Sequence, residues 1–232
     1  MISVIIPTYN EASQIQQTIQ KIWLHDHAHL IKEIIIADGG STDGTIEKGL
    51  SEGVAVHRCS AKGRAVQMNL GAAEAKGSIL YFLHADTIPP VGFSTDILRA
   101  VQKGYIAGCY RLDFDYQHWF LRANCWFTRF NFHCFRFGDQ SLFIKTDLFS
   151  RCGGFCEKHT VLEDQEIIYR IRKKGKFIVI NKRVITSTRK YLDNGIFKTQ
   201  GIFYLIYAMY QLGFSQQQLL VTYRNLIRQD KL

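Results

Sequence analysis

Polar residues that could bind or react with a ligand follow three apolar runs in the 232-residue chain. They lie in residues 7–11 (PTYNE), 38–44 (DGGSTDG) and 84–87 (HADT). A carboxylate at the end of a buried strand is costly unless it is solvated, paired or bound to a metal, so Asp86 is a candidate ligand. The loop after Asp38 opens a predicted helix, where backbone amides and a strand-end carboxylate can meet a nucleotide. The alternative for this loop is a tight turn in which Ser41 or Thr42 caps the helix.

Further charged residues occur later in the chain. A helix predicted over residues 62–76 carries Arg64, and the adjacent carboxylates Glu163 and Asp164 begin another predicted helix, where the helix dipole tolerates negative charge. Acidic residues are also common in first helical turns without any function. Nine cations then follow with no carboxylate between them: Arg170, Arg172, Lys173, Lys174, Lys176, Lys182, Arg183, Arg189 and Lys190. With a net charge of +9, the chain should attract phosphate, nucleic acid or anionic lipid.

The elements that must position these residues alternate in the first 110 residues. Apolar, β-branched runs predict strands over residues 2–6, 31–37, 54–57, 79–83 and 105–110, and helical patterns occupy residues 12–24 and 62–76. This alternation is typical of βαβ units with a mostly parallel sheet. Ligands bind beyond the carboxyl ends of strands in such sheets, so the three polar segments should meet at one edge and form a site.

The pattern changes after Arg111. Residues 114–137 hold ten aromatic side chains and few turn residues, which predicts helix and loop. A strand is predicted over 142–144, a helix over 163–173, a strand over 177–180, and two helices after Tyr191 that are separated near Gly213. We therefore expect one domain with a helical tail.

Composition excludes several classes of protein. With 47% hydrophobic and 21% charged residues the chain can close a sizeable core, and the longest apolar run, residues 202–210, is far shorter than the ~20 residues of a membrane-spanning helix. The amino terminus resembles no signal peptide, so we expect a cytoplasmic protein. Six cysteines without a C-x-x-C pair are then expected to be free thiols.

Taken together, the order and spacing of these segments resemble the family 2 glycosyltransferases, which have the type-A nucleotide-sugar (GT-A) fold. The resemblance covers residues 1–190 and rests on residues 4–11, the loop 38–45, Arg64, the strand ending at Asp86, and the Glu163–Asp164 pair. More narrowly, residues 82–87 (FLHADT), 138–143 (GDQSLF) and 186–191 (TSTRKY) resemble a bacterial subgroup, the radical-SAM/selenodomain-associated transferase 2 proteins.

The resemblance implies a Rossmann-like α/β fold with a mostly parallel central sheet flanked by helices. Residues 1–190 would form the transferase domain, with a nucleotide-binding half over 1–110 and an acceptor or catalytic half over 111–190. Residues 191–232 would form a C-terminal helical segment packed on the same domain.

The resemblance also implies the roles of individual residues. The nucleotide would contact Pro7, Thr8, Tyr9, Glu11, Asp38, Gly39, Arg64, Ala85 and Asp86. Asp86 matches the last carboxylate of the family's Asp-x-Asp motif, which bridges the sugar diphosphate through Mg²⁺ or Mn²⁺, ions that prefer oxygen ligands. His84 replaces the first Asp, and it could be a metal ligand, a hydrogen-bonding neighbour or a packed side chain.

In the same way the resemblance places the catalytic base in the Glu-Asp pair, with Asp164 preferred to Glu163, and implies inversion at the anomeric carbon. Asp139, Gln140, Arg189 and Lys190 would contact the diphosphate or the acceptor. Arg189 and Lys190 could share neutralisation of the leaving group with the metal. The alternative for these cations is a solvated basic face.

The expected function is transfer of a sugar from a UDP- or GDP-sugar to a hydroxyl acceptor, either a small molecule or a lipid-linked molecule at the inner membrane face. The apolar segment 196–214 is expected to contact the membrane peripherally or to be buried in a homodimer or against the domain. A sugar nucleotidyltransferase is the first alternative, but the Gly-rich, Arg- and Lys-bearing loop typical of that class is absent after the first strand. A basic nucleic-acid-binding module is the second, and it lacks any RNA-binding signature. No nucleic-acid partner is therefore expected.

Overall fold

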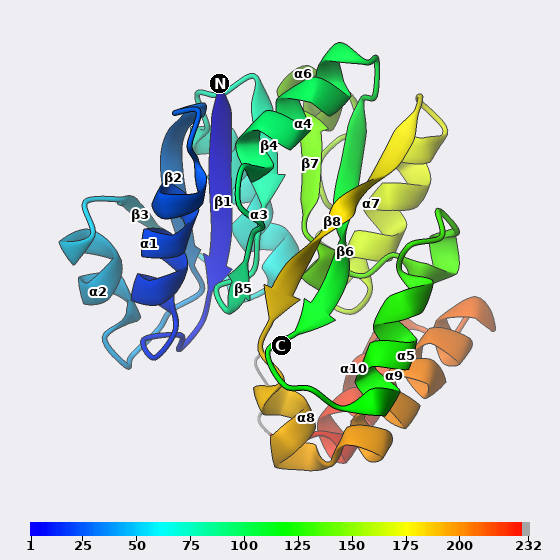
Figure 1. Ribbon diagram of the computed structural model, residues 1–232. Coiled ribbons are helices and arrows are strands. Elements are labelled where there is room, and N and C mark those ends of the chain that lie inside the picture. The colour runs from blue at the N-terminus through cyan, green and yellow to red at the C-terminus, as the bar shows by residue number, and fades with distance from the viewer. Residues whose placement is uncertain (229–232) are drawn as a thin grey trace.

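A computed structural model describes residues 1–228, which form a mixed eight-stranded sheet flanked by helices (Figure 1). The strands are β1 (Ile2–Thr8), β2 (Ile31–Asp38), β3 (Ala55–Arg58), β4 (Ile79–Phe82), β5 (Thr87–Ile88), β6 (Ala107–Phe114), β7 (Leu142–Lys145) and β8 (Phe177–Thr186). Their order across the sheet is β3-β2-β1-β4-β7-β6-β8-β5. β7 runs antiparallel to β4 and β6, and β5 runs antiparallel to β8, while the other pairs are parallel. The predicted α/β fold with a mostly parallel sheet is confirmed.

Helices cover both faces of the sheet. They are α1 (Ile15–His25), α2 (Thr45–Ser51), α3 (Arg64–Glu74), α4 (Phe93–Gln102), α5 (Trp119–Phe127), α6 (Thr146–Arg151), α7 (Glu163–Arg172), α8 (Arg189–Asn194), α9 (Ile196–Gln211) and α10 (Gln216–Leu226). Short 3₁₀ turns occupy His133–Phe135 and Gly138–Gln140. One core joins α1, α4 and α5 to one face of the sheet, and a second core joins α3, α6 and α7 to the other.

Strand β1 shows why these residues form a buried central strand. All seven of its side chains are buried, with Val4 and Ile6 in one core and Ile5 in the other, because successive strand residues face opposite sides of a sheet. A strand covered on both faces needs a continuous apolar run rather than alternation. That run is the feature by which the sequence predicts the strand.

Several elements differ from those predicted. Helix α4 is missing from the prediction, because Pro89, Pro90 and Gly92 precede it and indicate a loop. Strands β6 and β8 continue to Phe114 and Thr186, well beyond the predicted ends. The exposed Asn181 to Arg183 interrupt the apolar pattern of β8, but ladder pairing with β6 maintains the strand.

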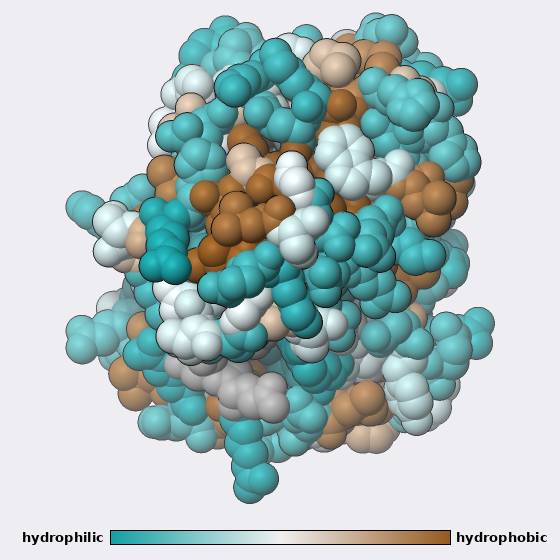
Figure 2. All heavy atoms as spheres, turned by 90° about the vertical axis from the view of Figure 1, so that its left-hand side faces the viewer, coloured by the Kyte–Doolittle hydropathy of each residue, from teal (hydrophilic) through white to brown (hydrophobic). Residues whose placement is uncertain are grey.

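As far as residue 228, the C-terminal part holds three helices, α8, α9 and α10, rather than the two predicted. Helices α9 and α10 form a third core with Val161 through Ile202, Ile206, Leu219 and Tyr223. Within residues 1–228 no helix is both long and apolar enough to cross a membrane. The six cysteines are free thiols, as predicted. The side of the molecule at the edge strand β3 is mostly hydrophilic around a small apolar patch (Figure 2).

Candidate functional site

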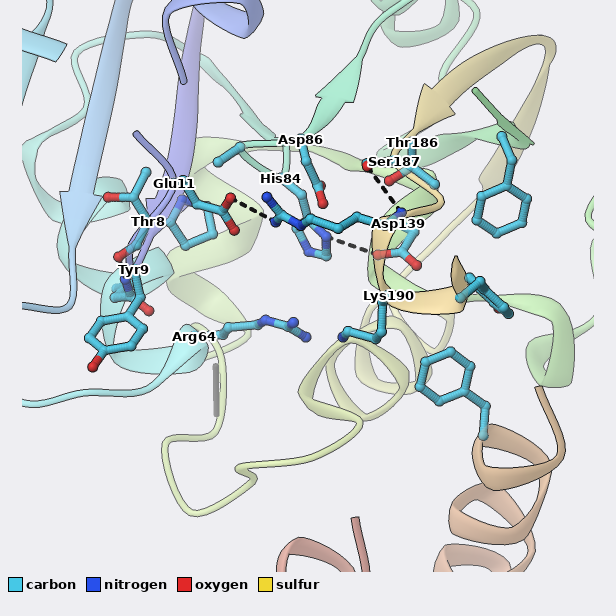
Figure 3. A pocket seen from close by; sticks show the side chains of 17 residues that line it. Thr8, Tyr9, Glu11, Arg64, His84, Asp86, Asp139, Thr186, Ser187 and Lys190 are labelled. Atoms are coloured by element: carbon cyan, nitrogen blue, oxygen red, sulfur yellow. Dashed lines mark hydrogen bonds and ion pairs between the residues drawn. The ribbon is translucent and has the colours of Figure 1, made fainter. Parts of the chain in front are cut away.

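A polar cavity of about 100 Å³ lies at the carboxyl edge of the sheet (Figure 3). Strands β1, β4, β6 and β8 all end there, so chain segments far apart in sequence contribute to one wall. Its lining residues are Pro7, Thr8, Tyr9, Glu11, Arg64, Gln67, His84, Ala85, Asp86, Phe114, Asp139, Thr186, Ser187, Arg189, Lys190, Tyr191 and Phe203. Most of the predicted nucleotide and diphosphate residues are therefore brought together, and we call this space the polar cavity.

An ion pair spans the polar cavity. Arg189, the first residue of α8, reaches across to the loop after β1, where its Nη2 lies 3.0 Å from the Glu11 Oε2. Figure 3 marks this ion pair by the dashed line that ends at Glu11. Burial alone would lower the pKa of Arg189, but the hydrogen bond and charge of Glu11 outweigh it and the pKa is raised. Arg189 therefore stays charged at the mouth of the cavity.

A second ion pair forms the floor. His84 Nδ1 lies 3.0 Å from Asp139 Oδ1 (Figure 3). Burial lowers the pKa of His84, but the hydrogen bond and charge of Asp139 outweigh this and the pKa is raised. Burial acts in the opposite direction on Asp139, but His84, Lys190 and Arg64 lower its pKa to about 2. The pair is therefore an imidazolium and a carboxylate over a wide pH range.

Asp86 lies beside this pair without an ion-pair partner of its own among the described residues. Burial raises its pKa, and the charges of Asp139 and Glu11 add to the rise, while His84 and Arg189 act against it. Its carboxylate is thus a desolvated anion with too little positive charge around it. Such a group favours a bound cation.

Three arginine and lysine side chains line the polar cavity in addition to the His84 imidazolium. Besides Arg189, they are Arg64, whose Nη1 is 3.8 Å from Glu163 Oε1, and Lys190, whose Nζ donates a hydrogen bond to Tyr223 Oη at 3.0 Å and has no ion-pair partner among residues 1–228. Guanidinium and ammonium groups bind phosphate oxygens through charge-assisted hydrogen bonds. The arrangement can therefore hold a diphosphate.

Three predicted contact residues do not line the polar cavity. Asp38 is fully buried, and its two carboxylate oxygens accept hydrogen bonds from Thr8 Oγ1 at 2.9 Å and from the Ser41 amide and hydroxyl at 2.8 and 2.5 Å. A methyl group at Gly39 would lie 2.9 Å from Gln67 Nε2, and Gln140 is buried, with its Oε1 accepting a hydrogen bond from the Phe137 amide. Asp38 holds its loop together, because a buried carboxylate needs donors and the loop supplies them. No Ser41 or Thr42 cap is present on α2, which begins after Gly44.

These contacts change the expected result of replacing Asp38. From sequence, Asp38→Ala is expected to weaken nucleotide binding without unfolding the protein. Because the substitution leaves several loop donors without an acceptor, we now expect it also to lower the free energy of unfolding by about 2–4 kcal/mol. Urea unfolding measures this, with the exposed Thr42→Ala as the control in the same loop. Equal stability of both variants would show that the loop does not depend on Asp38.

Sequence reasoning missed Gln67. Its Nε2 donates to the Thr8 carbonyl at 2.5 Å and to the Ala37 carbonyl at 3.0 Å, so it joins the ends of β1 and β2. Gln67 follows Arg64 by three residues, so both side chains lie on one face of α3. This spacing is the sequence feature that could have placed Gln67 near the site. Phe203 was also missed, and it lies so far along the chain that no local pattern points to it.

A larger cavity of about 370 Å³ adjoins the polar cavity. The two share Arg64, His84, Phe114, Asp139, Lys190, Tyr191 and Phe203. The rest of its wall is largely apolar and aromatic, with Leu112, Phe127, Phe135, Phe137, Val161, Leu162, Tyr204, Ile206 and Tyr207 among its residues. We call this space the aromatic cavity.

Glu163 and Asp164 enter the aromatic cavity at the start of α7. Burial raises the pKa of Asp164 to about 7, and the neighbouring charge of Glu163 adds to the rise. A methyl group at Gly138 would lie 3.1 Å from both Asp164 Oδ2 and His84 Nε2, so Asp164 and His84 lie close to each other beside this glycine. A carboxyl group with a pKa near neutrality at this junction is suited to accept a proton.

Solved structures with a similar fold bind nucleotides. A mannosyltransferase from Pyrobaculum calidifontis in complex with GDP-Man and Mn²⁺ aligns with a TM-score of 0.69 and 18% identity over 97% of this chain and 67% of that one. S. aureus TarS in complex with UDP aligns with a TM-score of 0.66 and 16% identity, over 80% of this chain and 60% of that one. The fold is therefore that of the GT-A transferases.

Sequence comparison then identifies the family. Residues 3–156 match the family model Glycosyl transferase family 2, and the chain belongs to this family. It is 28% identical over 200 residues to a PGL/p-HBAD biosynthesis glycosyltransferase of Mycobacterium tuberculosis, covering 81% of this chain and 76% of that protein. Glycosyltransferase AglE of Haloferax volcanii is 32% identical over 94 residues, which are 38% of this chain and 31% of that protein. The family resemblance is confirmed, whereas the narrower radical-SAM/selenodomain-associated subgroup stays a prediction.

Proposed function

We propose that the protein transfers a sugar from a nucleoside-diphosphate donor to a hydroxyl group of an acceptor, with inversion at the anomeric carbon. The observation that carries this proposal is the junction of two cavities. The polar cavity offers three cations to a diphosphate, and the aromatic cavity offers the Asp164 carboxylate to an acceptor. The anomeric carbon of a donor would lie where the cavities meet, beside His84 and Asp139.

In this proposal the nucleotide lies along Pro7, Thr8 and Tyr9, with its diphosphate toward Arg64 and Arg189. UDP and GDP-Man in the complexes of TarS and the Pyrobaculum enzyme support a donor of this kind. Glu11 and Arg189 are paired in the wall of the polar cavity, so a donor's phosphates would compete with Glu11 for the guanidinium. Lys190 supplies a second positive charge from the same helix.

A divalent cation fits one residue of the polar cavity well. Among residues 1–228 no three His, Cys, Asp or Glu side chains are grouped to hold a metal, so phosphate oxygens would have to complete the coordination. The poorly compensated carboxylate of Asp86 suits Mg²⁺ or Mn²⁺, whereas the His84 Nδ1 is engaged by Asp139. When bound, such a cation would stabilise the charge on the departing diphosphate as a Lewis acid.

Asp164 is the proposed base. The acceptor hydroxyl would give its proton to the Asp164 carboxylate while its oxygen forms a bond to the anomeric carbon. The bond from that carbon to the diphosphate oxygen breaks on the opposite face, and its electron pair leaves with the nucleoside diphosphate. The cations Arg64, Arg189 and Lys190 then hold the product phosphate.

The aromatic cavity also favours one class of acceptor. Its volume of about 370 Å³ and its phenylalanine and tyrosine walls favour a hydroxyl carried by an apolar or aromatic group, because a strongly hydrated acceptor would lose its water without new hydrogen bonds. Small aryl alcohols and lipid-linked alcohols both meet this condition.

The donor proposal is tested by thermal unfolding with UDP, GDP, CDP and dTDP, each with and without Mn²⁺. One nucleotide, UDP or GDP, should raise Tm selectively and more strongly with Mn²⁺. At a ligand concentration of about 100 Kd the stabilisation is about 2.7 kcal/mol, which is roughly 5–10 °C for a chain of this size. A panel in which no nucleotide shifts Tm would contradict the proposed donor class.

A further inference from the structure

A cleft of about 360 Å³ lies on the outer side of strand β6, away from the polar cavity. Four arginines and two tryptophans dominate its wall: Arg111, Arg122, Arg129, Arg183, Trp119 and Trp126. The charged residues lining it are these four arginines and Asp113, so the cleft has a net charge of +3. We call it the arginine cleft.

The sheet itself brings two of these cations together. Arg111 of β6 and Arg183 of β8 are direct cross-strand partners in the parallel ladder. A shift in register after Tyr110 produces this pairing, because β8 skips from Ile180 to Arg183 at that point. Like charges directly opposite one another on a sheet are destabilising. A β-bulge changes the direction in which side chains point, and bulges are frequent beside functional sites.

The only carboxylate of the cleft cannot neutralise it. Asp113 Oδ2 lies 2.9 Å from Arg183 Nη1 and is committed to that pair. Among the described residues Arg111, Arg122 and Arg129 have no acidic partner, and the buried Nε atoms of Arg111 and Arg129 have no hydrogen-bond acceptor. Burial lowers the pKa of Arg111, and the positive charges of Arg129 and Arg183 lower it further. Asp113 therefore leaves most of the positive charge of the cleft without compensation from the described residues.

Helix α5 adds a regular pattern to the same cleft. Trp119, Arg122 and Trp126 follow one another at spacings of three and four residues, which places them on one face of the helix, and Arg129 lies in the turn directly after it. The guanidinium of Arg129 lies 4.6 Å from the centre of the Trp126 ring. Helix α5 packs beside β6 (Figure 1), so these side chains lie next to the arginines of the sheet.

An exposed aromatic surface continues from the cleft. Trp119 is 68% exposed and contacts the ring of Phe197, which is 57% exposed at the start of α9. At the other end of α5, Trp126 contacts Phe127, and both are close to half exposed. Tryptophan is enriched where a membrane meets water, because one part of the ring is apolar and the indole N–H is polar.

We propose that the arginine cleft binds the phosphate of an anionic phospholipid headgroup and that α5 and the start of α9 thereby lie against a membrane surface. The cleft would hold one headgroup phosphate, while Trp119, Trp126 and Phe197 enter the interfacial layer. A nucleic-acid duplex would use the same cations but would leave this aromatic surface in water, whereas a single strand would stack its bases on the rings, so single-stranded RNA is the competing probe in the test below. The cleft shares Leu112 and Cys125 with the aromatic cavity, so a docked membrane would adjoin the proposed acceptor space.

Vesicle sedimentation of the full chain tests the proposal without any sugar transfer. The wild type should bind vesicles of phosphatidylcholine mixed with phosphatidylglycerol and should bind phosphatidylcholine alone far more weakly. Each cation near a membrane surface contributes about fivefold, so Arg122→Gln/Arg129→Gln should weaken binding by about 25-fold. The exposed single variant Arg122→Gln, which cannot disturb the core, should lose about fivefold.

Controls separate this site from a general effect of charge. Lys174→Gln/Lys176→Gln removes two exposed cations outside the cleft and should bind vesicles like the wild type. Equal losses in both double variants would overturn the proposal. It would also be overturned if the wild type bound glycerol 3-phosphate but no vesicles, or bound single-stranded RNA in an Arg122- and Arg129-dependent way and no vesicles.

Discussion

Asp164→Asn should lower the rate of sugar transfer by about 10²- to 10⁴-fold while leaving nucleotide affinity unchanged, because loss of a general base affects the reaction and not donor binding. The amide keeps the shape of the side chain and the hydrogen bond that Asp164 Oδ1 accepts from the Gln165 amide, but it cannot take a proton. Transfer from a labelled nucleotide sugar and calorimetry of nucleotide binding measure the two quantities separately.

Glu163→Gln is the matched control, because it is the same chemical change one residue away. Neighbouring helical residues point about 100° apart, and Glu163 points toward Arg64, 3.8 Å away, whereas Asp164 adjoins Gly138. We expect Glu163→Gln to retain most of the transfer rate. If Asp164→Asn is fully active and Glu163→Gln is inactive, Glu163 is the base. If both variants are fully active, the proposed mechanism is wrong.

The pH profile gives the same variant a second readout. Burial and the charge of Glu163 raise the pKa of Asp164 to about 7, and the base acts as a carboxylate, so transfer should rise with pH through about 7 and then level off. The folded state holds this proton more tightly than the unfolded state, so stability from Asp164 falls as pH rises from about 4 to 7. Asp164→Asn should therefore raise Tm more above pH 7 than near pH 5.

Local patterns predict the fold where one element contains its own signal. The apolar runs of β1, β2 and β4 indicate buried parallel strands, and parallel strands bring Thr8 and Asp86 to one edge whatever the details of the loops. Helix α4 and the second half of β8 depend on tertiary packing instead. Phe93, Ile97 and Ala100 are buried against the sheet, but prolines and glycine directly before them indicate a loop.

The site shows a similar division. Residue type alone cannot distinguish a carboxylate that contacts a ligand from one that holds a loop, and Asp38 and Asp86 both follow buried strands. The two carboxylates differ in the hydrogen-bond donors around them. Thr8 and Ser41 donate to Asp38, whereas few donors surround Asp86. The aromatic cavity was not predictable at all, because its walls come from α5, α7 and α9.

Asp86 should control the response to metal. Asp86→Asn should abolish the increase in nucleotide affinity that Mn²⁺ produces, because it removes the only carboxylate in the polar cavity that lacks a positive partner among the described residues. Without metal, the same variant should bind UDP or GDP at least as tightly as the wild type. The reason is electrostatic: the Asp86 charge adds to those of Glu11 and Asp139 and repels a diphosphate when no cation is present.

His84→Ala tests whether His84 binds the metal directly or only holds Asp139 in place. If His84 only holds Asp139 in place, its loss should reduce the Mn²⁺ effect by about 10-fold rather than remove it. Calorimetry of nucleotide binding with Mn²⁺ and with EDTA measures all three proteins. An undiminished Mn²⁺ effect in Asp86→Asn would rule out Asp86 as a ligand. Full wild-type transfer in EDTA would mean that Arg64, Arg189 and Lys190 neutralise the leaving diphosphate without any metal, since these are the cations that face it.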